Sequence, residues 1–282
     1  MSGSRSFPFV QVEFGFALGP ADGRYVVRSQ PDAAPRRVIV LGTLAAPPPR
    51  RRRRRLRPVE AAAPAPAPIS RATVIGAAPM QSGDDAARWL GALRADAHAL
   101  DAEVGDALGE LNGLLRTYRA AAADPLVRDV ALGQALALRV GHGAGERVAD
   151  GRFDAAYEVD LRARPPRRRE LLAPQERMSA VLAGRATVPP SEELVLRARG
   201  DLVAIRPREA ALQARVALEA LLAELADGSE PAVEALGEAR EPVSRAANAA
   251  LEGEPSPELQ AEVTAAVELM AGTVRRRALR SS

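Results

Sequence analysis

The sequence predicts an α+β fold, in which a small antiparallel sheet and a long helix are followed by an α-helical, αα-hairpin domain. Apolar residues alternate with a period of two near the start of the chain, as they do in β-strands. They recur at helical spacing over residues 82–124 and again in every segment beyond residue 174. We therefore place the domains at residues 1–160 and 174–282, with a basic linker at 161–173 between them.

Four segments of the first domain have the alternation and composition of β-strands. Residues 10–18 would point five apolar side chains to one face, namely Val10, Val12, Phe14, Phe16 and Leu18. Turn-forming residues at 19–23 lead to a second candidate strand at 24–28, which predicts a hairpin. Residues 37–41 and 71–75 are further candidates, so we expect a sheet of three or four strands.

Residues 82–124 predict one continuous helix, with Ser82 as its N-cap and carboxylates in its first turn. Because its apolar stripe is longer than a four-stranded sheet would cover, we expect it to need another helix, from this chain or from a second copy. Residues 135–140 could end a helix or form a strand, and residues 141–145 are expected to be a turn or loop.

The second domain is predicted to be helical at residues 174–184, 191–204, 207–227, 231–251 and 257–279. Pro207 would occupy the first turn of its helix, which makes 191–227 an αα-hairpin. This hairpin is similar to one tetratricopeptide-type helical pair, but a stable array needs about three repeats, and we find no second copy. We expect the large apolar residues of the hairpin to pack between its helices: Leu194, Leu196, Leu202, Leu212, Val216, Leu218, Leu221, Leu222 and Leu225.

The positive charge of the chain is concentrated in one segment. All 39 basic residues are arginine, and removing seven of them from the net charge of +3 leaves −4. These seven are Arg50, Arg51, Arg52, Arg53, Arg54, Arg55 and Arg57. The surrounding residues 45–69 are rich in Pro and Ala, which predicts a disordered, extended, cationic loop. Compositional drift toward arginine and a functional role both remain open as the origin of the run.

Arginine clusters are suited to binding phosphate groups. The octet at residues 50–57, together with Arg167, Arg168 and Arg169, could bind nucleic acid or another polyanion. No aromatic residue lies among these arginines to stack on bases, so such binding would be independent of sequence. The same octet could instead contact anionic lipid headgroups or an acidic protein tail.

The sequence offers few residues for catalysis or metal binding. It has no cysteine and only two histidines, His98 and His142, so neither a metal site nor a cofactor is predicted. His98 and Asp101 are one helical turn apart, which favours a surface contact. The best ligand-loop candidate comprises Gly141, His142, Gly143 and Gly145, because glycines let backbone amides converge on phosphate. Its spacing matches neither a dinucleotide-binding motif nor a P-loop, and a flexible turn is the alternative.

These observations favour a non-enzymatic interaction or scaffold protein, with helical docking surfaces and a cationic tether loop. We expect a protein partner or self-association. The alternatives are a sequence-non-specific nucleic-acid-binding protein and an enzyme or ligand binder that uses residues 141–145. No segment approaches the roughly 20 apolar residues of a membrane span. The absence of a signal-peptide pattern and of cysteine is typical of a cytoplasmic protein.

Overall fold

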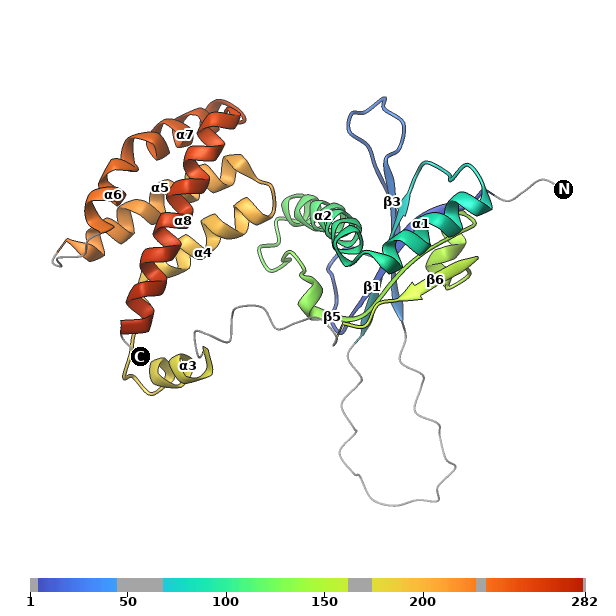
Figure 1. Cartoon of the computed structure of the whole chain (residues 1–282), viewed down its shortest axis with the longest axis horizontal. Coiled ribbons are helices and arrows are strands. Elements are labelled where there is room, and N and C mark those ends of the chain that lie inside the picture. Colours follow the sequence, from blue (N-terminus) through green and yellow to red (C-terminus); the bar gives the residue numbers. More distant parts are fainter. Residues whose placement is uncertain (1–4, 45–67, 162–173, 227–231, 281–282) are drawn as a thin grey trace, which may run out of the picture. The chain divides into compact units, whose positions relative to one another are not determined.

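The computed structural model describes residues 5–44, 68–161, 174–226 and 232–280. The chain divides into two compact units, Met1–Arg164 and Pro165–Ser282, and each is considered by itself (Figure 1). The predicted α+β class is confirmed, because a six-stranded antiparallel sheet precedes a largely helical part. The arginine octet and Arg167, Arg168 and Arg169 lie outside the described residues.

The sheet of the first unit is antiparallel throughout, and β1 lies near its centre between β4 and β5. Its strand order is β2-β3-β4-β1-β5-β6. Because β1 is covered on both faces, four consecutive residues from Phe9 to Val12 are buried. The strands are β1 (Phe7–Phe14), β2 (Gly23–Val27), β3 (Arg37–Leu44), β4 (Ile69–Gly76), β5 (Ala135–Gly143) and β6 (Ala155–Glu158).

Three expectations about the strands are wrong. The predicted hairpin does not form, because β1 pairs with β4 and β5 and leaves no free edge for β2, which pairs with β3 instead. The sheet has six strands rather than three or four, since β5 and β6 arise within residues 126–160. Residues 135–140 take the strand alternative, and β5 continues through Gly141, His142 and Gly143, where a turn or loop was expected.

The predicted continuous helix at 82–124 is two helices, α1 (Gly83–Ala95) and α2 (Ala97–Ala122). Asp96 interrupts it with an extended backbone, φ −121° and ψ 106°. Its carboxylate accepts hydrogen bonds from the backbone N–H groups of His98 at 2.8 Å and Ala99 at 3.3 Å, which caps the start of α2. The predicted N-cap Ser82 is confirmed, since its hydroxyl accepts from the Asp85 N–H at 3.1 Å.

The apolar stripe of these two helices is buried on the sheet of the same unit (Figure 1). Leu93, Leu100, Val104, Leu111 and Leu115 share one core with apolar residues of strands β1, β3, β4 and β5. The expectation that the stripe needs a partner helix is therefore wrong. Six strands form a wider surface than four, and the break at Asp96 lets α1 and α2 cross that surface in their own directions.

The opposite face of the sheet is partly covered by the 3₁₀-helix η2 (Gly145–Asp150), which packs Val148 against Phe9 and Ile75. A second short 3₁₀-helix, η1 (Leu132–Gln134), leads into β5. Buried Gln11 also faces η2, because its side-chain amide donates to Thr73 Oγ1 at 3.0 Å and to the Val148 carbonyl at 3.3 Å.

The second unit is a helical bundle in which α4 and α5 form the predicted αα-hairpin and pack with α7 and α8. The predicted single helix at 231–251 is two helices, because Pro242, which has no N–H, fits only the first turn of α7. The helices are α3 (Pro174–Leu182), α4 (Pro190–Val203), α5 (Pro207–Leu225), α6 (Ala232–Glu238), α7 (Arg240–Glu252) and α8 (Pro257–Arg280). Within the described ranges, no helix has both the length and the apolar character of a membrane span.

Candidate functional site

Packing explains two of the glycines predicted to form a ligand loop. A Cβ on Gly143 would lie 2.8 Å from Val148 Cγ1 and 2.9 Å from Phe153 Cα, so only glycine lets the segment after β5 fold back onto the sheet. A Cβ on Gly141 would collide with the backbone of β6 at Ala155 and Ala156. Gly145 begins η2 with φ +59°, a left-handed conformation that favours glycine. The ligand-binding role of these residues stays a prediction.

His142 is buried and belongs to a polar cluster with Ser6 and Asp154. The Ser6 hydroxyl lies 3.0 Å from His142 Nδ1 and donates to Asp154 Oδ2 at 3.1 Å. The Ser6 hydroxyl therefore bridges the imidazole and the carboxylate. In a nucleophilic triad the imidazole stands between the carboxylate and the hydroxyl, whereas here the hydroxyl stands between the other two. The cluster therefore joins the start of β1 to β5 and to the segment before β6.

The sequence carried no signal for this cluster, since its members are separated by 136 and 148 residues in the chain. The other histidine, His98, is exposed in the first turn of α2. Among the described residues, no three His, Asp or Glu side chains gather as a metal site requires.

A charged network crosses the face of the sheet that α1 and α2 do not cover. Glu13 Oε1 accepts from Arg71 Nη2 and Arg139 Nη1, each at 2.9 Å, and Arg139 Nε donates to Glu158 at 3.2 Å. Burial alone would raise the pKa of Glu13, but hydrogen bonds and positive charge from Arg139 and Arg71 outweigh it and lower this pKa. Two guanidinium groups and two carboxylates balance one another, so the network ties four strands together without excess charge.

In the second unit, the latter half of α5 buries Leu218, Leu221 and Leu225, as expected, whereas in its first half small residues are buried and larger apolar residues lie outside. Alanines form the inner face of the first half of α5, at Ala210, Ala211, Ala214 and Ala217. On its outer face, one turn apart, Leu212 is 37% exposed and Val216 is 55% exposed. Leu212 and Val216 were expected between the hairpin helices, and that expectation is wrong.

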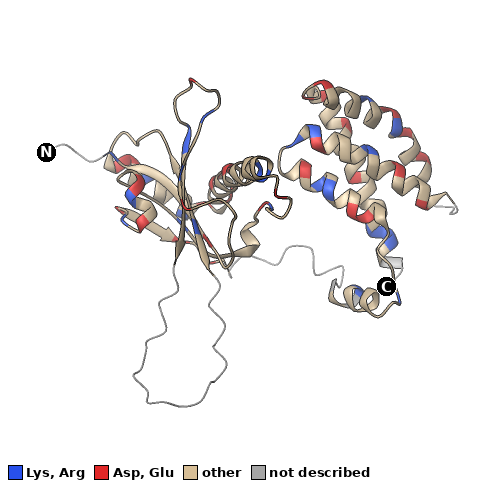
Figure 2. Cartoon of the chain, turned by 180° about the vertical axis from the view of Figure 1, so that it is seen from behind, with Lys and Arg blue, Asp and Glu red and all other residues tan. Residues whose placement is uncertain are grey.

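Helix α4 also exposes large apolar residues. Val195 and Ala198 are buried, whereas Leu196 is 62% exposed and Val203 is 80% exposed. Leu196 was also expected inside the hairpin, and it too lies outside. We call Leu196, Val203, Leu212 and Val216 the outer apolar residues of the hairpin. Figure 2 shows arginine and carboxylate residues distributed along the helices of this unit.

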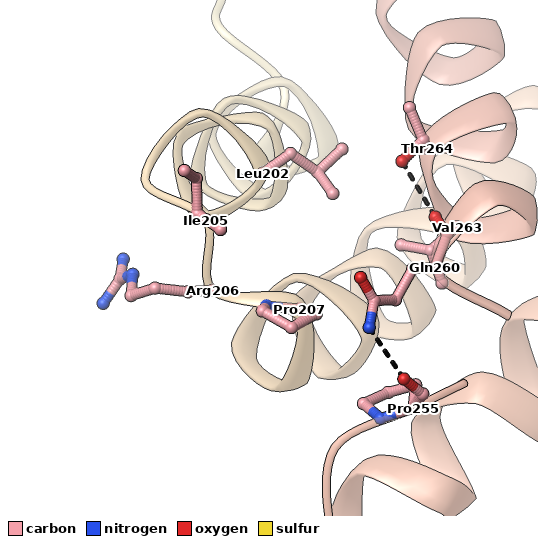
Figure 3. Close-up of a pocket in the computed structure, with 8 residues that line it drawn as sticks. All are labelled: Leu202, Ile205, Arg206, Pro207, Pro255, Gln260, Val263 and Thr264. Atoms are coloured by element: carbon pink, nitrogen blue, oxygen red, sulfur yellow. Dashed lines mark hydrogen bonds between the residues drawn. The ribbon is translucent and has the colours of Figure 1, made fainter. Parts of the chain in front are cut away.

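A pocket of about 150 Å³ opens beside the turn between α4 and α5, where the start of α8 meets it (Figure 3). Its polar groups are already engaged in part: the Gln260 amide donates to the Pro255 carbonyl at 2.7 Å, and the Thr264 hydroxyl donates to the Gln260 carbonyl at 2.8 Å. Arg206 also lines the pocket, although its guanidinium group points away from it (Figure 3). Its apolar wall consists of Leu202, Ile205, Pro207, Pro255 and Val263.

Comparison with protein-family models, with curated proteins and with solved structures found no match.

Proposed function

We propose that this chain is a non-enzymatic interaction protein whose α4–α5 hairpin docks a protein partner through its outer apolar residues. The observation that carries the proposal is the distribution of side-chain size on the first half of α5. There, alanines face the interior of the bundle, while Leu212 and Val216 face outward. Single exposed apolar residues are ordinary on protein surfaces, but here two larger side chains lie one helical turn apart, where a partner would bury them together.

The outer apolar residues of the hairpin would stabilise a complex if a partner buried them. Full burial of a leucine or valine side chain stabilises by about 1.5–3 kcal/mol. The folded chain leaves most of this gain unrealised at Leu196 and Val203 on α4, and part of it at Leu212 and Val216 on α5. A partner that covers either outer face would obtain it, and large apolar residues commonly form the centre of such interfaces.

The test is the double variant Leu212→Glu/Val216→Glu in the full chain, with partners captured from lysate and quantified. We expect a set of proteins that the wild type retains to be lost, because two carboxylates would be desolvated in the interface. The melting temperature should fall only modestly, because Val216 is 55% exposed, although Leu212, at 37%, is partly buried. Self-association is measured in parallel by sedimentation.

The matched control is Leu126→Glu/Leu251→Glu, which makes the same chemical change at exposed leucines outside α4 and α5. The control should keep the captured set. The proposal is wrong if both variants retain the same proteins and the same sedimentation behaviour as the wild type.

A second candidate function is sequence-non-specific binding of a polyanion through the arginine octet. It is favoured by the register of the first unit, in which Leu44 at the end of β3 pairs with Ile69 at the start of β4. Both ends of the octet's segment are therefore anchored at one end of the sheet. Seven arginines predict a slope of log affinity against log salt no steeper than about −6. The affinity for DNA of random sequence, measured at several salt concentrations, should show this slope. The slope should be lost when residues 50–57 are deleted; an unchanged slope would reject this second function.

A further inference from the structure

The pocket beside the α4–α5 turn has the size of one apolar side chain. Its volume is about 150 Å³, and an apolar cavity of about that size can hold a benzene molecule. Small-molecule sites generally occupy about 300–1,000 Å³, so a single leucine-sized group is the better match. Three apolar side chains and two prolines form one part of the wall, where an apolar group would fit, and Arg206, Gln260 and Thr264 form the rest.

Ile205 forms one side of this pocket in a backbone conformation that isoleucine rarely adopts. Its φ is +53°, in the left-handed region, and its side chain is 87% exposed. The turn closes through a hydrogen bond from Arg206 N to the Asp201 carbonyl at 2.9 Å and one from Ile205 N to the Leu202 carbonyl at 3.1 Å. This is the Schellman arrangement, whose left-handed position normally holds glycine. Strain of this kind recurs at sites that have a function, where the side chain is needed.

Three carboxylates lie close in sequence to the pocket residue Pro255. Glu252, Glu254 and Glu258 are exposed, each is within three residues of Pro255, and none forms an ion pair with another described residue. Glu254 Oε1 is 3.5 Å from the amide of Gln260, a pocket residue. The Gln260 Oε1 atom receives no hydrogen bond within the described part of the chain and is an acceptor for an incoming donor. The occupant that we match to these surroundings is therefore apolar at one position and cationic next to it.

The chain itself contains such a segment outside the described residues. Leu56 is the one apolar residue in the octet, between Arg55 and Arg57. It is twelve residues from Leu44, the last residue of β3, so it can reach at most about 40 Å from the end of the sheet. In sequence the octet is flanked by Pro58 and by prolines at 47–49, and a proline in a peptide lowers the entropy that it loses on binding.

The geometry points to docking of residues 50–58 from a second copy of this chain, with Leu56 in the pocket and the flanking arginines beside Glu252, Glu254 and Glu258. This inference rests on the proposed function of the helical unit as a docking surface, and it names the occupant. The contact is head-to-tail, since the segment and the pocket are different surfaces. It would give an association that weakens with salt, because its ionic component is exposed.

The experiment is sedimentation velocity of the full chain over a range of concentrations, at low and high salt. We expect the wild type to self-associate at low salt. Leu56→Ser should weaken this association by about tenfold or more, the loss that removing one buried leucine side chain brings. Ile205→Gly should weaken it as well, because one wall of the pocket is lost. A peptide of residues 47–59 should compete with the association, and the same peptide with Leu56→Ser should compete about tenfold less well.

Ile205→Gly also tests whether a loss of association could result from unfolding of the variant. Glycine adopts a φ of +53° without strain, so this variant should melt no lower than the wild type. Leu126→Ser, which changes an exposed leucine in the first unit, is the control and should associate as the wild type does.

Three results would overturn the inference. The first is a wild-type protein that stays monomeric at every concentration. If this monomer binds the peptide, the segment would occupy the pocket of its own chain and not that of a second copy. The second is equal competition by the peptide of natural sequence and the peptide with Leu56→Ser, which would show attraction by charge alone. The third is unchanged association in Ile205→Gly. If Leu212→Glu/Val216→Glu abolishes partner capture in that case, the proposed function stands and only the pocket assignment fails.

Discussion

Three helix ends show how this chain uses the left-handed backbone conformation. Helices α2, α3 and α4 each end in the same pair of hydrogen bonds, with Ala123, Gly184 and Ile205 at the left-handed position. Gly184 suits that position. Ala123 and Ile205 are strained there, because their Cβ lies close to the following carbonyl oxygen, which costs roughly 1–2 kcal/mol. Ile205 is the most unusual of the three because it is also β-branched. Gly184 meets the same backbone requirement without strain at the end of α3. Isoleucine at position 205 is therefore better explained by a contact that its side chain makes.

At the scale of single residues, Gly143→Ala tests whether β5 requires glycine for packing. The new Cβ would approach Val148 Cγ1 to 2.8 Å and Phe153 Cα to 2.9 Å, so η2 and the segment after it must shift. We expect a loss of about 1–3 kcal/mol in the free energy of unfolding. Urea unfolding can be followed through Trp89, the single tryptophan, which packs against the core of the first unit.

Gly133→Ala is the control for this substitution, because a Cβ at Gly133 meets open space and its φ lies outside the left-handed region. It should leave the midpoint of unfolding nearly unchanged. Equal unfolding free energies for the two variants would contradict the packing explanation and return Gly143 to the ligand-loop hypothesis.

At the scale of whole elements, local signals predicted helices well and strand pairing poorly. The N-cap at Ser82 and Pro207 in the first turn of α5 depend only on neighbouring residues, and both are correct. Pairing depends on residues far apart in sequence. Nothing near β1 indicates that it takes β4 and β5 as neighbours, and the nearest strand in sequence, β2, pairs elsewhere. The glycines at the end of β5 predicted a loop where the structure has a strand. Contacts with η2, β6 and the segment between them require these glycines, and the sequence of the strand does not reveal those contacts.

The candidate docking surfaces were still less accessible to sequence reasoning. Helical spacing identifies apolar residues, but it does not say which of two apolar faces a helix buries. In the first half of α5 the bundle buries the alanine face, because small side chains let the helix axes approach closely. The pocket depends on Ile205 and Gln260, which are brought together from the α4–α5 turn and from α8. Neither residue carries a local signal for this.

At the scale of the whole molecule, the chain has no lysine, and its 39 arginines stay protonated. The response of stability to acid therefore depends on carboxylates and on how the fold treats them. Glu13 is the informative one. It lies at the centre of the sheet network, and Arg139 and Arg71 lower its pKa despite burial, which would raise it.

This lowered pKa fixes the sign of a pH dependence. A carboxyl group whose pKa is lower in the folded than in the unfolded state stabilises the fold fully above its ordinary value of 4.5. The contribution is lost as the pH falls through the folded-state pKa. We expect Glu13→Gln to reduce the free energy of unfolding by about 1.5–3 kcal/mol at pH 7, since charge-assisted hydrogen bonds are lost. The difference from the wild type should narrow steadily below pH 4.5.

Urea titrations followed through Trp89 between pH 7 and about pH 3 measure this difference for the first unit. Glu146→Gln serves as the control, because Glu146 pairs with Arg24 at a surface where both side chains are about half exposed. Such a pair contributes about 0–1 kcal/mol, so its variant should follow the wild type across the whole range. A difference between wild type and Glu13→Gln that stayed constant or widened in acid would mean that the two arginines stabilise the sheet by packing alone, without the charge of Glu13.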